Sequence, residues 1–428
     1  MARMLALTAR LPYPPREGHQ LRSWHILRAA ARAHEVTLLS FRREDDAPLD
    51  QCGPLRDMLA GLETFPVAAQ HSHAALLRAL VMGVVGTKPF VAEKYASARM
   101  RDRAAELARQ SDLVHVDILP LMPLLDGMRE AIPVVLNAHN VEHALLRQRA
   151  EVERGWAARL FLRTQVAKLA RFERDACRRA DHVLACSADD ARQLSALAPD
   201  TPVSIVPNGV DTASIVPARG AAAQRVSIVF VGQMAWFPNR DGMEWFLAEI
   251  FPRILAQRPD AQFVHVGKSD GFRVPAALRP SVRLAGFVED LAPIVADATV
   301  VVVPLRAGSG TRLKVLEAMA FAKPIVTTHV GAEGIDLAPG REALFADDAP
   351  EFAEAVLHLI ANPGDAAHMG RAAREKAQAT YDWGAIGATA LSAYARALQS
   401  TAEVNAGRAA HASGSSPLQP VRGSPLRT

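Results

Sequence analysis

Short apolar runs rich in Val, Ile and Leu recur along the chain, and most are followed by a loop and then by a segment with helical spacing. The first unit has an apolar run at 4–9, a proline-rich loop with Gly18, a helical segment over 21–32 and another run at 34–41. Such runs are typical of strands buried on both faces of a parallel sheet. We therefore predict a doubly wound α/β fold, in which ligands bind beyond the carboxyl ends of the strands.

The same pattern predicts strands at 63–67, 112–116, 133–137, 181–187, 203–206, 225–231, 261–266, 282–286, 299–303 and 325–327. A chain of 428 residues, half of them apolar, is too long for one ordinary core and has enough apolar material for two. We place an N-terminal domain at 1–202, a C-terminal domain at 203–375, a helix at 376–400 and a tail at 401–428. The tail is rich in Ala, Gly, Ser, Pro and Arg, so we predict that it is disordered.

The segment 300–334 carries the main indication of function. Its first strand is followed by a loop that contains Gly308, Ser309 and Gly310, and a helix is predicted to begin near Thr311. Free N–H groups at a helix N-terminus form an anion site when neighbouring glycines let a ligand approach the backbone. The loop and the start of the helix therefore predict a phosphate-binding site.

Lys314 and Glu317 extend this site along the predicted helix. Lys314 lies one turn in and adds a cation, while Glu317, three residues later, shares its face and can accept hydrogen bonds from paired sugar hydroxyls. Phosphate and ribose together indicate a nucleotide. The familiar nucleotide motifs are not completed in this segment, because Leu313 holds the last glycine position of G-x-G-x-x-G and the loop has no G-K-[ST].

The sequence GSGTRLKVLEAMAFAKPIVTTHVGAEG at 308–334 resembles the donor-binding segment of glycosyltransferase family 4, whose members are retaining enzymes of the GT-B fold. The resemblance extends to VPNGVD at 206–211, to NAHN at 137–140 and to the loop at Gly18. The segments PYPPREGHQLRSWHILRAAARAHEV and VGQMAWFPNRDGMEWFLAEIFPRI resemble sugar transferases associated with exosortase (PEP-CTERM) exopolysaccharide systems. This resemblance implies two Rossmann-like domains facing a cleft, with the helix at 376–400 crossing back to the N-terminal domain.

The resemblance also implies roles for individual residues. His139 would hydrogen-bond the transferred sugar near the reacting centre, and Lys314 and Glu317 would complete the catalytic set. The implied donor site comprises Gly18, Gly232, Arg240, Val288, Gly308, Ser309, Gly310, Thr311, Arg312, Lys314 and Glu317.

Two positions depart from the family's pattern. Gln233 stands where the family usually has an arginine, which leaves the donor's diphosphate to Arg312 and Lys314, with Arg240 as a helper. Ser309 stands where the family commonly has the first of two glutamates separated by seven residues, so that carboxylate is missing. The exosortase-type relatives resemble this glycine-serine form, so we do not infer inactivity from it.

Charge and cysteine content narrow the partners and the compartment. The net charge of +4 arises from 49 basic and 45 acidic residues that are interspersed, which argues little for nucleic acid. The three cysteines have neither zinc-site spacing nor the even number of a disulfide framework. The N-terminal apolar run before Arg10 is too short for a signal-peptide core. We expect a cytoplasmic protein, placed at most at the inner face of the membrane.

The predicted helix at 21–32 leaves two interpretations open for membrane contact. It carries Arg22, Arg28 and Arg32 beside several large apolar residues, so it can present a basic apolar surface to an anionic membrane or a lipid-linked acceptor. An ordinary solvated helix face fits the same pattern.

A metal site is not expected. His139 and His143 are four residues apart, but HNVEH differs from the zinc motif H-E-x-x-H and no third ligand is evident. We expect neither a metal nor another cofactor.

Together these features predict a retaining, metal-independent glycosyltransferase that moves a sugar from a nucleotide-diphosphate donor to a glycan or a polyprenyl-linked acceptor, in exopolysaccharide or cell-envelope synthesis. One alternative is a sugar-nucleotide epimerase, which would need paired acid and base groups near the sugar, and only His139 stands out. Another alternative is a non-catalytic nucleotide-sugar-binding scaffold, which the departures at Gln233 and Ser309 motivate.

Overall fold

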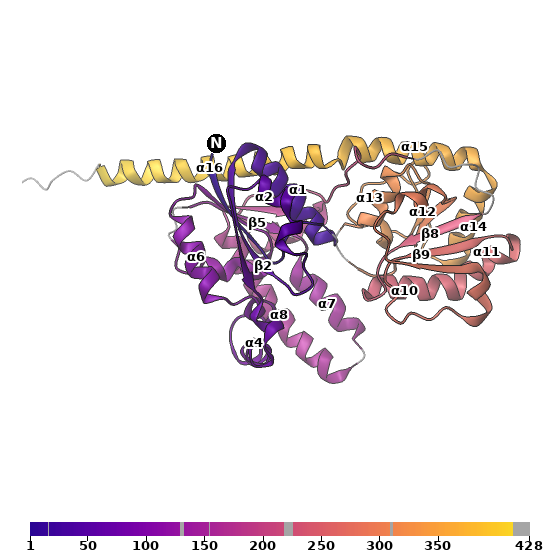
Figure 1. Ribbon diagram of the computed structural model, residues 1–428, viewed down its shortest axis with the longest axis horizontal. Coiled ribbons are helices and arrows are strands. Elements are labelled where there is room, and N and C mark those ends of the chain that lie inside the picture. The colour runs from indigo at the N-terminus through magenta and orange to yellow at the C-terminus, as the bar shows by residue number, and fades with distance from the viewer. Residues whose placement is uncertain (16, 129–131, 154, 218–225, 309–310, 414–428) are drawn as a thin grey trace, which may run out of the picture.

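The computed structural model describes residues 1–15, 17–128, 132–153, 155–217, 226–308 and 311–413. Within these residues the chain forms two parallel sheets, each flanked by helices, that lie beside each other (Figure 1). The predicted fold of two doubly wound α/β units is therefore confirmed. The predicted site residues Ser309 and Gly310 lie outside the described residues.

The N-terminal sheet has the order β3-β2-β1-β4-β5-β6-β7, with every neighbouring pair parallel. Its strands are β1 (Arg3–Thr8), β2 (Glu35–Arg42), β3 (Gly61–Pro66), β4 (Leu113–Val116), β5 (Val134–Ala138), β6 (His182–Ala185) and β7 (Val203–Ile205). The strand order reverses direction between β1 and β4. Such a switch point opens a crevice at the carboxyl ends of the two strands.

The helices of the N-terminal half cover both faces of this sheet. They are α1 (Gly18–Ala33), α2 (Gly53–Asp57), α3 (Ala68–His71), α4 (His73–Val85), α5 (Phe90–Lys94), α6 (Ala98–Ala108), α7 (Glu142–Val152), α8 (Trp156–Arg179) and α9 (Ala188–Leu197), with 3-10 turns at Leu49–Gln51 and Leu119–Leu125. The helices α7 and α8 follow each other closely in the chain but are separate. Gly155, which has the lowest helix propensity apart from proline, is extended at the N-terminal cap of α8.

The C-terminal sheet has the order β10-β9-β8-β11-β12-β13, again all parallel. Its strands are β8 (Ser227–Val231), β9 (Gln262–Val266), β10 (Val282–Gly286), β11 (Val300–Val303), β12 (Ile325–Thr327) and β13 (Leu344–Phe345). Its helices are α10 (Phe237–Trp245), α11 (Phe251–Gln257), α12 (Ala292–Ala296), α13 (Leu313–Ala320), α14 (Ala349–Ala361) and α15 (Pro363–Thr380), with a π-helical turn at Phe246–Ile250 and 3-10 turns at Ala276–Ser281 and Val330–Ala332. The switch point here lies between β8 and β11.

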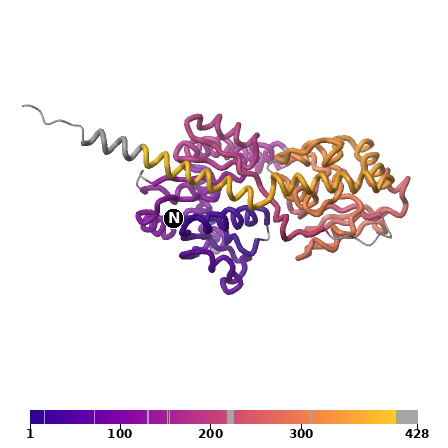
Figure 2. Tube along the Cα trace, turned by 90° about the horizontal axis from the view of Figure 1, so that it is seen from above, coloured from indigo at the N-terminus to yellow at the C-terminus, as the bar shows by residue number. Residues whose placement is uncertain are grey.

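The last helix, α16 (Trp383–Ser413), leaves the C-terminal half and runs along the N-terminal half (Figure 2). Its residues Trp383, Ile386 and Tyr394 are buried in one core cluster with β1 and α1. The Tyr394 hydroxyl lies 3.0 Å from His115 Nδ1 on β4. The last helix is therefore part of the N-terminal core rather than an appendage of the sheet that precedes it.

Two predicted boundaries need correction. The strand Val203–Ile205 pairs with β6, so the N-terminal sheet extends past the boundary that we placed after residue 202. Helix α16 continues to Ser413, beyond the start of the tail that we predicted to be disordered from Thr401. The segment 401–413 is rich in alanine, which favours helix over disorder once a preceding helix supplies the nucleus. Residues 414–428 lie outside the described part of the chain.

Of the two interpretations left open for α1, the structure favours the ordinary solvated helix face, on which Arg28 and Arg32 are exposed. Arg22 is 1% exposed, and Ile26 and Leu27 are fully buried against the sheet and α16. The Arg22 guanidinium donates to Asn137 Oδ1 at 2.7 and 2.9 Å and to the Val206 carbonyl at 2.7 Å. The helix thus presents its large apolar residues to the core, and its most buried arginine fixes the segment that leads to the C-terminal half.

His25 on α1 makes the fold sensitive to acid. Its ring stacks on Trp383 with centroids 4.6 Å apart, and burial lowers the pKa of His25 to about 4. A histidine with a lowered folded pKa stabilises the fold above its unfolded pKa of about 6.5, and this contribution is lost as the pH falls toward 4. The free energy of unfolding should therefore be about 2 kcal/mol lower at pH 5 than well above pH 6.5, because His25 takes up a proton more readily in the unfolded chain.

Lowering the pH from 7 to 5 should reduce the free energy of unfolding less in His25→Phe than in the unaltered protein. Urea unfolding at the two pH values measures this difference. The exposed His368 provides the matched control, because His368→Phe should leave the pH dependence unchanged. Equal pH dependence of the His25 variant and the unaltered protein would show that His25 is not the sensitive group.

Candidate active-site cleft

His139 lies directly after β5, at the carboxyl end of the N-terminal sheet. Its Nε2 atom is 3.3 Å from Asp117 Oδ1 and 3.1 Å from Asn137 Nδ2. Asp117 directly follows β4, so the two neighbouring strands deliver an imidazole and a carboxylate to one place. A histidine held by a carboxylate has a fixed ring orientation, which suits a hydrogen bond to a substrate.

Asp117 is anchored on both oxygens. The Ser23 hydroxyl donates to Oδ2 at 2.6 Å, and the Asn137 amide donates to Oδ1 at 3.0 Å. Burial by itself would raise the pKa of Asp117, but the neighbouring imidazoles of His139 and His115 outweigh it and hold this pKa well below its usual range. The carboxylate therefore stays ionised.

His19, the second residue of α1, lies close to this pair. Burial and the neighbouring His139 lower the pKa of His19 to about 4. Its Nε2 atom is buried and has no hydrogen-bond partner among the described residues. At pH 7 the imidazole is thus neutral and can donate to or accept from a ligand.

The C-terminal side of the cleft is built on Lys314, on the first turn of α13. Its ammonium donates to Asn239 Oδ1 at 2.5 Å and lies 4.4 Å from the centre of the Phe230 ring. Gly232 follows β8, and a Cβ atom at this position would lie 2.9 Å from Lys314 Nζ and 2.6 Å from Asn239 Nδ2. Any residue other than glycine would therefore push on the lysine head group.

Lys314 and Glu317 form a pair with strongly shifted protonation. Burial lowers the pKa of Lys314 to about 7, with the charge of Arg312 adding to the effect. Burial raises the pKa of Glu317 to about 7, against the charge of Lys314. Shifts of this size arise where charged groups are held out of water, and they are common at sites that bind charged ligands.

Arg312, at the N-terminal cap of α13, is 3% exposed. Its guanidinium donates to the Val330 carbonyl at 3.3 Å and pairs with Glu333 at 3.2 Å. A Cβ atom at Gly308 would lie 2.9 Å from Arg312 Nη2, so this glycine makes room for the guanidinium. The Arg312 side chain thus connects the loop that contains Gly308 with the segment that contains Val330 and Glu333.

Thr311 directly precedes Arg312 in the same loop. The Thr311 hydroxyl oxygen is buried and lacks a hydrogen-bond partner within the described residues. Buried hydroxyls are normally satisfied, so this one marks a place where a ligand oxygen can be received.

Arg240 and Val288 are placed differently from the Lys314 cluster. The Arg240 guanidinium donates to the carbonyls of Met234 and Asp270 at 3.2 and 2.8 Å, and it is Asn239 that reaches Lys314. Val288 is half-buried in the loop after β10, at the edge of the sheet. Binding of the donor's phosphates by Arg240 therefore stays a prediction. The neighbouring Asn239 is the residue that contacts Lys314.

The N-terminal and C-terminal halves approach each other closely at Gly18 and Leu313. A Cβ atom at Gly18 would lie 2.7 Å from Leu313 Cδ1, so the start of α1 touches the start of α13. Both helices begin at the switch points of their sheets, which face one another where the two halves adjoin in Figure 1. The anion-binding end of one helix is thereby brought beside the other.

The histidines at 139 and 143 do not form a pair. His143 Nδ1 lies 2.5 Å from Glu173 Oε2, whereas His139 turns to Asp117. The described residues hold no group of three or more His, Cys, Asp or Glu side chains with metal-site geometry.

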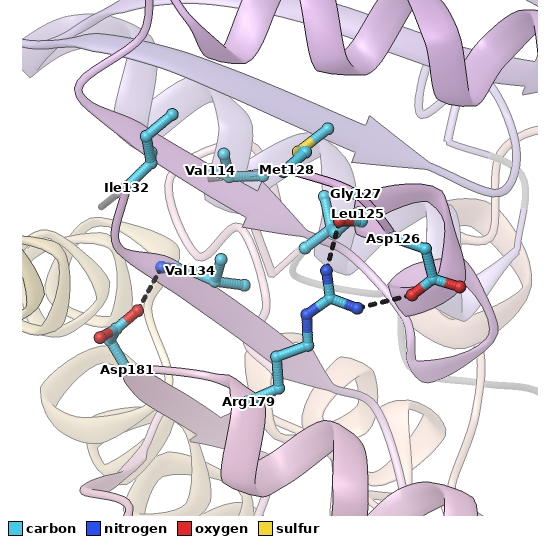
Figure 3. A pocket seen from close by; sticks show the side chains of 9 residues that line it. All are labelled: Val114, Leu125, Asp126, Gly127, Met128, Ile132, Val134, Arg179 and Asp181. Carbon is cyan, nitrogen blue, oxygen red and sulfur yellow. Dashed lines mark hydrogen bonds and ion pairs between the residues drawn. The ribbon is translucent and has the colours of Figure 1, made fainter. Parts of the chain in front are cut away.

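Figure 3 shows a pocket at the opposite edge of the N-terminal sheet. It is lined by Val114, Val134 and Asp181, near the amino ends of their strands, and by Arg179, which bonds Asp126 at 2.7 Å. Ligands of doubly wound sheets bind at the other edge, so this pocket is separate from the candidate site.

Known proteins identify the two halves. Residues 18–214 match the family model described as "Glycosyltransferase Family 4", and residues 225–362 match the model described as "Glycosyl transferases group 1". Each half of the chain is therefore similar to a glycosyltransferase domain family. The junction of the two halves lies between 214 and 225, after the last strand of the N-terminal sheet and before β8.

Curated relatives match parts of the chain. D-inositol 3-phosphate glycosyltransferase from Kineococcus radiotolerans is 30% identical over 52% of this chain and 59% of its own length. An uncharacterized 44.6 kDa protein in the cps region of Klebsiella pneumoniae is 24% identical over 32% of this chain and 37% of its own length. The chain thus spans 59% and 37% of the lengths of these two relatives.

Solved structures match nearly the whole fold. Sucrose-phosphate synthase from Thermosynechococcus elongatus has a TM-score of 0.65 and 20% identity, and the match covers 95% of this chain and all of that one. Anabaena HepE in complex with UDP has a TM-score of 0.61 and 14% identity, with coverage of 95% and 100%. The two halves of the chain are therefore arranged as in a GT-B fold.

Proposed function

We propose that this protein is a retaining glycosyltransferase that uses a nucleotide-diphosphate sugar as its donor. The observation that carries the proposal is that the start of α1 approaches the start of α13, with a group of functional side chains in each half of the chain. One has a partly desolvated lysine at the start of α13, and the other has a carboxylate-held histidine at the end of β5. The matches to two glycosyltransferase domains and the fold shared with a UDP-bound protein support it.

The donor's diphosphate fits the first half-site. Lys314 and Arg312 supply positive charge, and the first N–H groups of α13 would add the positive end of the helix dipole. The Thr311 hydroxyl can donate to a phosphate oxygen. Glu317, one turn further along α13, would accept the ribose hydroxyls, and backbone groups near Val288 would meet the base. We assign Gly18 and Gly232 to close approach of the ligand.

The transferred sugar would lie between the diphosphate and His139. In the proposed reaction the bond from the anomeric carbon to the diphosphate oxygen breaks, and the acceptor hydroxyl oxygen bonds to that carbon from the same face. The acceptor's proton passes to the departing diphosphate. The protein's part is to stabilise the charge that develops on the diphosphate, and Lys314, Arg312 and the helix start are placed for this.

We propose that the reaction needs no metal, because two cationic side chains and a helix N-terminus serve the diphosphate's charge. The acceptor would be a glycan or a polyprenyl-linked saccharide at the inner face of the cytoplasmic membrane. The resemblance of 12–36 and 231–254 to exosortase-associated sugar transferases favours exopolysaccharide or envelope synthesis. No helix among the described residues is long and apolar enough to cross a membrane.

A thermal-shift screen against UDP, GDP, ADP and their common sugar conjugates, in the presence of EDTA, tests the donor site. A ligand at 100 times its dissociation constant should stabilise the fold by about 2.7 kcal/mol. One nucleotide series should raise the melting temperature, and mass spectrometry with membrane glycolipid extracts should then detect the transferred sugar. Failure of every nucleotide, with and without such extracts, would contradict the proposal.

The same screen separates the two other candidate functions. An epimerase would convert its bound sugar nucleotide without any acceptor, and the product would have an unchanged mass. A scaffold would bind the nucleotide sugar and leave it intact under all conditions. Transfer that requires an acceptor is the outcome expected here.

A further inference from the structure

The exposed apolar side chains are unevenly distributed over the surface. Of the fifteen large apolar side chains exposed within the described residues, eight belong to α4 and to the first part of α8. They are Leu76, Leu77, Val81, Met82, Val84, Val85, Trp156 and Leu160. We call this group the α4–α8 platform. Soluble proteins rarely gather so much apolar surface without a partner for it.

Helix α4 turns its apolar face outward. Leu77, Val81 and Val85 follow one another at four-residue spacing and are 62, 49 and 72% exposed. The small residues Ala79 and Gly83 lie on the opposite face and are buried. A helix that packs through its small residues and exposes its large ones offers those large side chains to something outside the molecule.

The platform is held rigidly. Lys168 of α8 donates to the carbonyls of Gly83, Val84 and Gly86 at 2.8, 2.5 and 2.7 Å, which satisfies the C-terminal end of α4. Gln165 adds a bond to the Gly83 carbonyl at 3.0 Å. These hydrogen bonds hold α4 against α8, so the exposed apolar side chains of α4 keep a fixed position on the surface.

The two chain segments that carry the platform hold only basic charges, and one of them, Lys88, pairs with Asp126 at 3.0 Å. The segments 68–92 and 156–172 contain no Asp or Glu. They contain six cationic residues, which are Arg78, Lys88, Arg159, Arg163, Lys168 and Arg171. Figure 1 shows α4 and the adjoining ends of α7 and α8 at the lower side of the N-terminal half, away from α16.

We propose that the α4–α8 platform docks this protein on an anionic lipid bilayer. Apolar side chains can enter the boundary between headgroups and acyl chains while neighbouring arginines meet lipid phosphates. The exposed Trp156, Leu160 and Arg163 share one face of α8 at spacings of four and three residues, which joins both interactions. A second copy of the chain fits less well, because an isologous contact would bring like charges together. The proposal holds whether or not the chain transfers sugar.

Sedimentation with vesicles tests the platform. The full chain should bind vesicles of phosphatidylglycerol mixed with phosphatidylethanolamine, and it should bind phosphatidylcholine vesicles much more weakly. The double variant Val81→Asp with Val85→Asp should lose at least tenfold in affinity, because the added charges oppose both insertion and the anionic surface. Arg163→Gln should lose about fivefold, the effect of one cation near an anionic surface. High salt should weaken binding of the unaltered protein.

Val216→Asp is the matched control, because Val216 is 70% exposed but lies in the segment that leads to the C-terminal half. This variant should bind as the unaltered protein does, and all variants should keep the same melting temperature. Equal binding by the double variant, or no binding of the unaltered protein to the anionic vesicles, would overturn the proposal. So would a dimer in solution that the double variant dissociates, since the platform would then be covered by a second copy.

Discussion

Replacing Lys314 with methionine should remove most of the affinity for the nucleoside diphosphate. The lysine supplies a charge-assisted hydrogen bond in a partly desolvated site, and losing it should cost about 2 to 3 kcal/mol, or roughly thirtyfold to a hundredfold in the dissociation constant. The fold should not suffer, because burial already disfavours the ammonium and lowers the pKa of Lys314 to about 7. Calorimetric titration and a melting curve measure the two effects.

Lys376 provides the control for this substitution. It lies on α15 and pairs at 2.9 Å with Asp336, whose side chain is 90% exposed. Lys376→Met should change neither nucleotide affinity nor stability noticeably, since exposed ion pairs contribute about 0 to 1 kcal/mol. If Lys314→Met bound the nucleoside diphosphate with unchanged affinity, the diphosphate would not bind at the start of α13.

The protonation of Lys314 gives the same experiment a second readout. A bound diphosphate favours the charged ammonium, so binding should raise the pKa of Lys314 and take up a proton when the pH is above about 7. The affinity should therefore fall about fivefold from pH 7 to pH 8 as the free lysine loses its proton. Titrations in buffers of different ionisation enthalpy count the protons, and Lys314→Met should abolish the uptake.

The arrangement of the strands could be predicted from the sequence because buried parallel strands are continuous apolar runs. The run at 299–303 and the loop after it predicted both β11 and the start of α13 at nearly the observed positions. Side-chain partners across the sheet could not be predicted in this way. They depend on register, which brings Asp117 beside His139 although 22 residues separate them. One signal was present, since both residues directly follow predicted strands.

Arg22 and Asn239 show the other limit of sequence patterns. Arg22 lies in an amphipathic segment and was interpreted as a surface residue, but it is buried because Asn137 and the Val206 carbonyl satisfy it. Asn239 was passed over in favour of the charged Arg240 next to it. Adjacent residues of a helix point about 100° apart around the helix axis. In α10 the side chain that contacts Lys314 is therefore that of Asn239 and not that of Arg240.

Replacing His139 with alanine should reduce turnover far more than nucleotide affinity. The imidazole lies on the N-terminal side of the cleft, held by Asp117, while the nucleotide is assigned to the C-terminal side. Loss of a positioned hydrogen bond near the reacting centre should lower kcat by about a hundredfold to a thousandfold. The dissociation constant for the nucleoside diphosphate should stay within about threefold, because a contact made only near the transition state contributes little to ground-state binding.

Asp117→Asn extends this test to the residue that positions His139. The amide keeps the shape of the side chain but removes the negative charge that lies 3.3 Å from His139 Nε2 and polarises the imidazole. We expect kcat to fall by at least tenfold, with a shift in its pH profile that His139→Ala does not show. His358, which lies 3.6 Å from Asp365 on the surface, is the control pair, and His358→Ala should leave turnover unchanged. If His139→Ala instead weakened nucleotide binding as much as it slowed turnover, the histidine would belong to the donor's binding site, and the sugar would have to lie on the far side of the diphosphate.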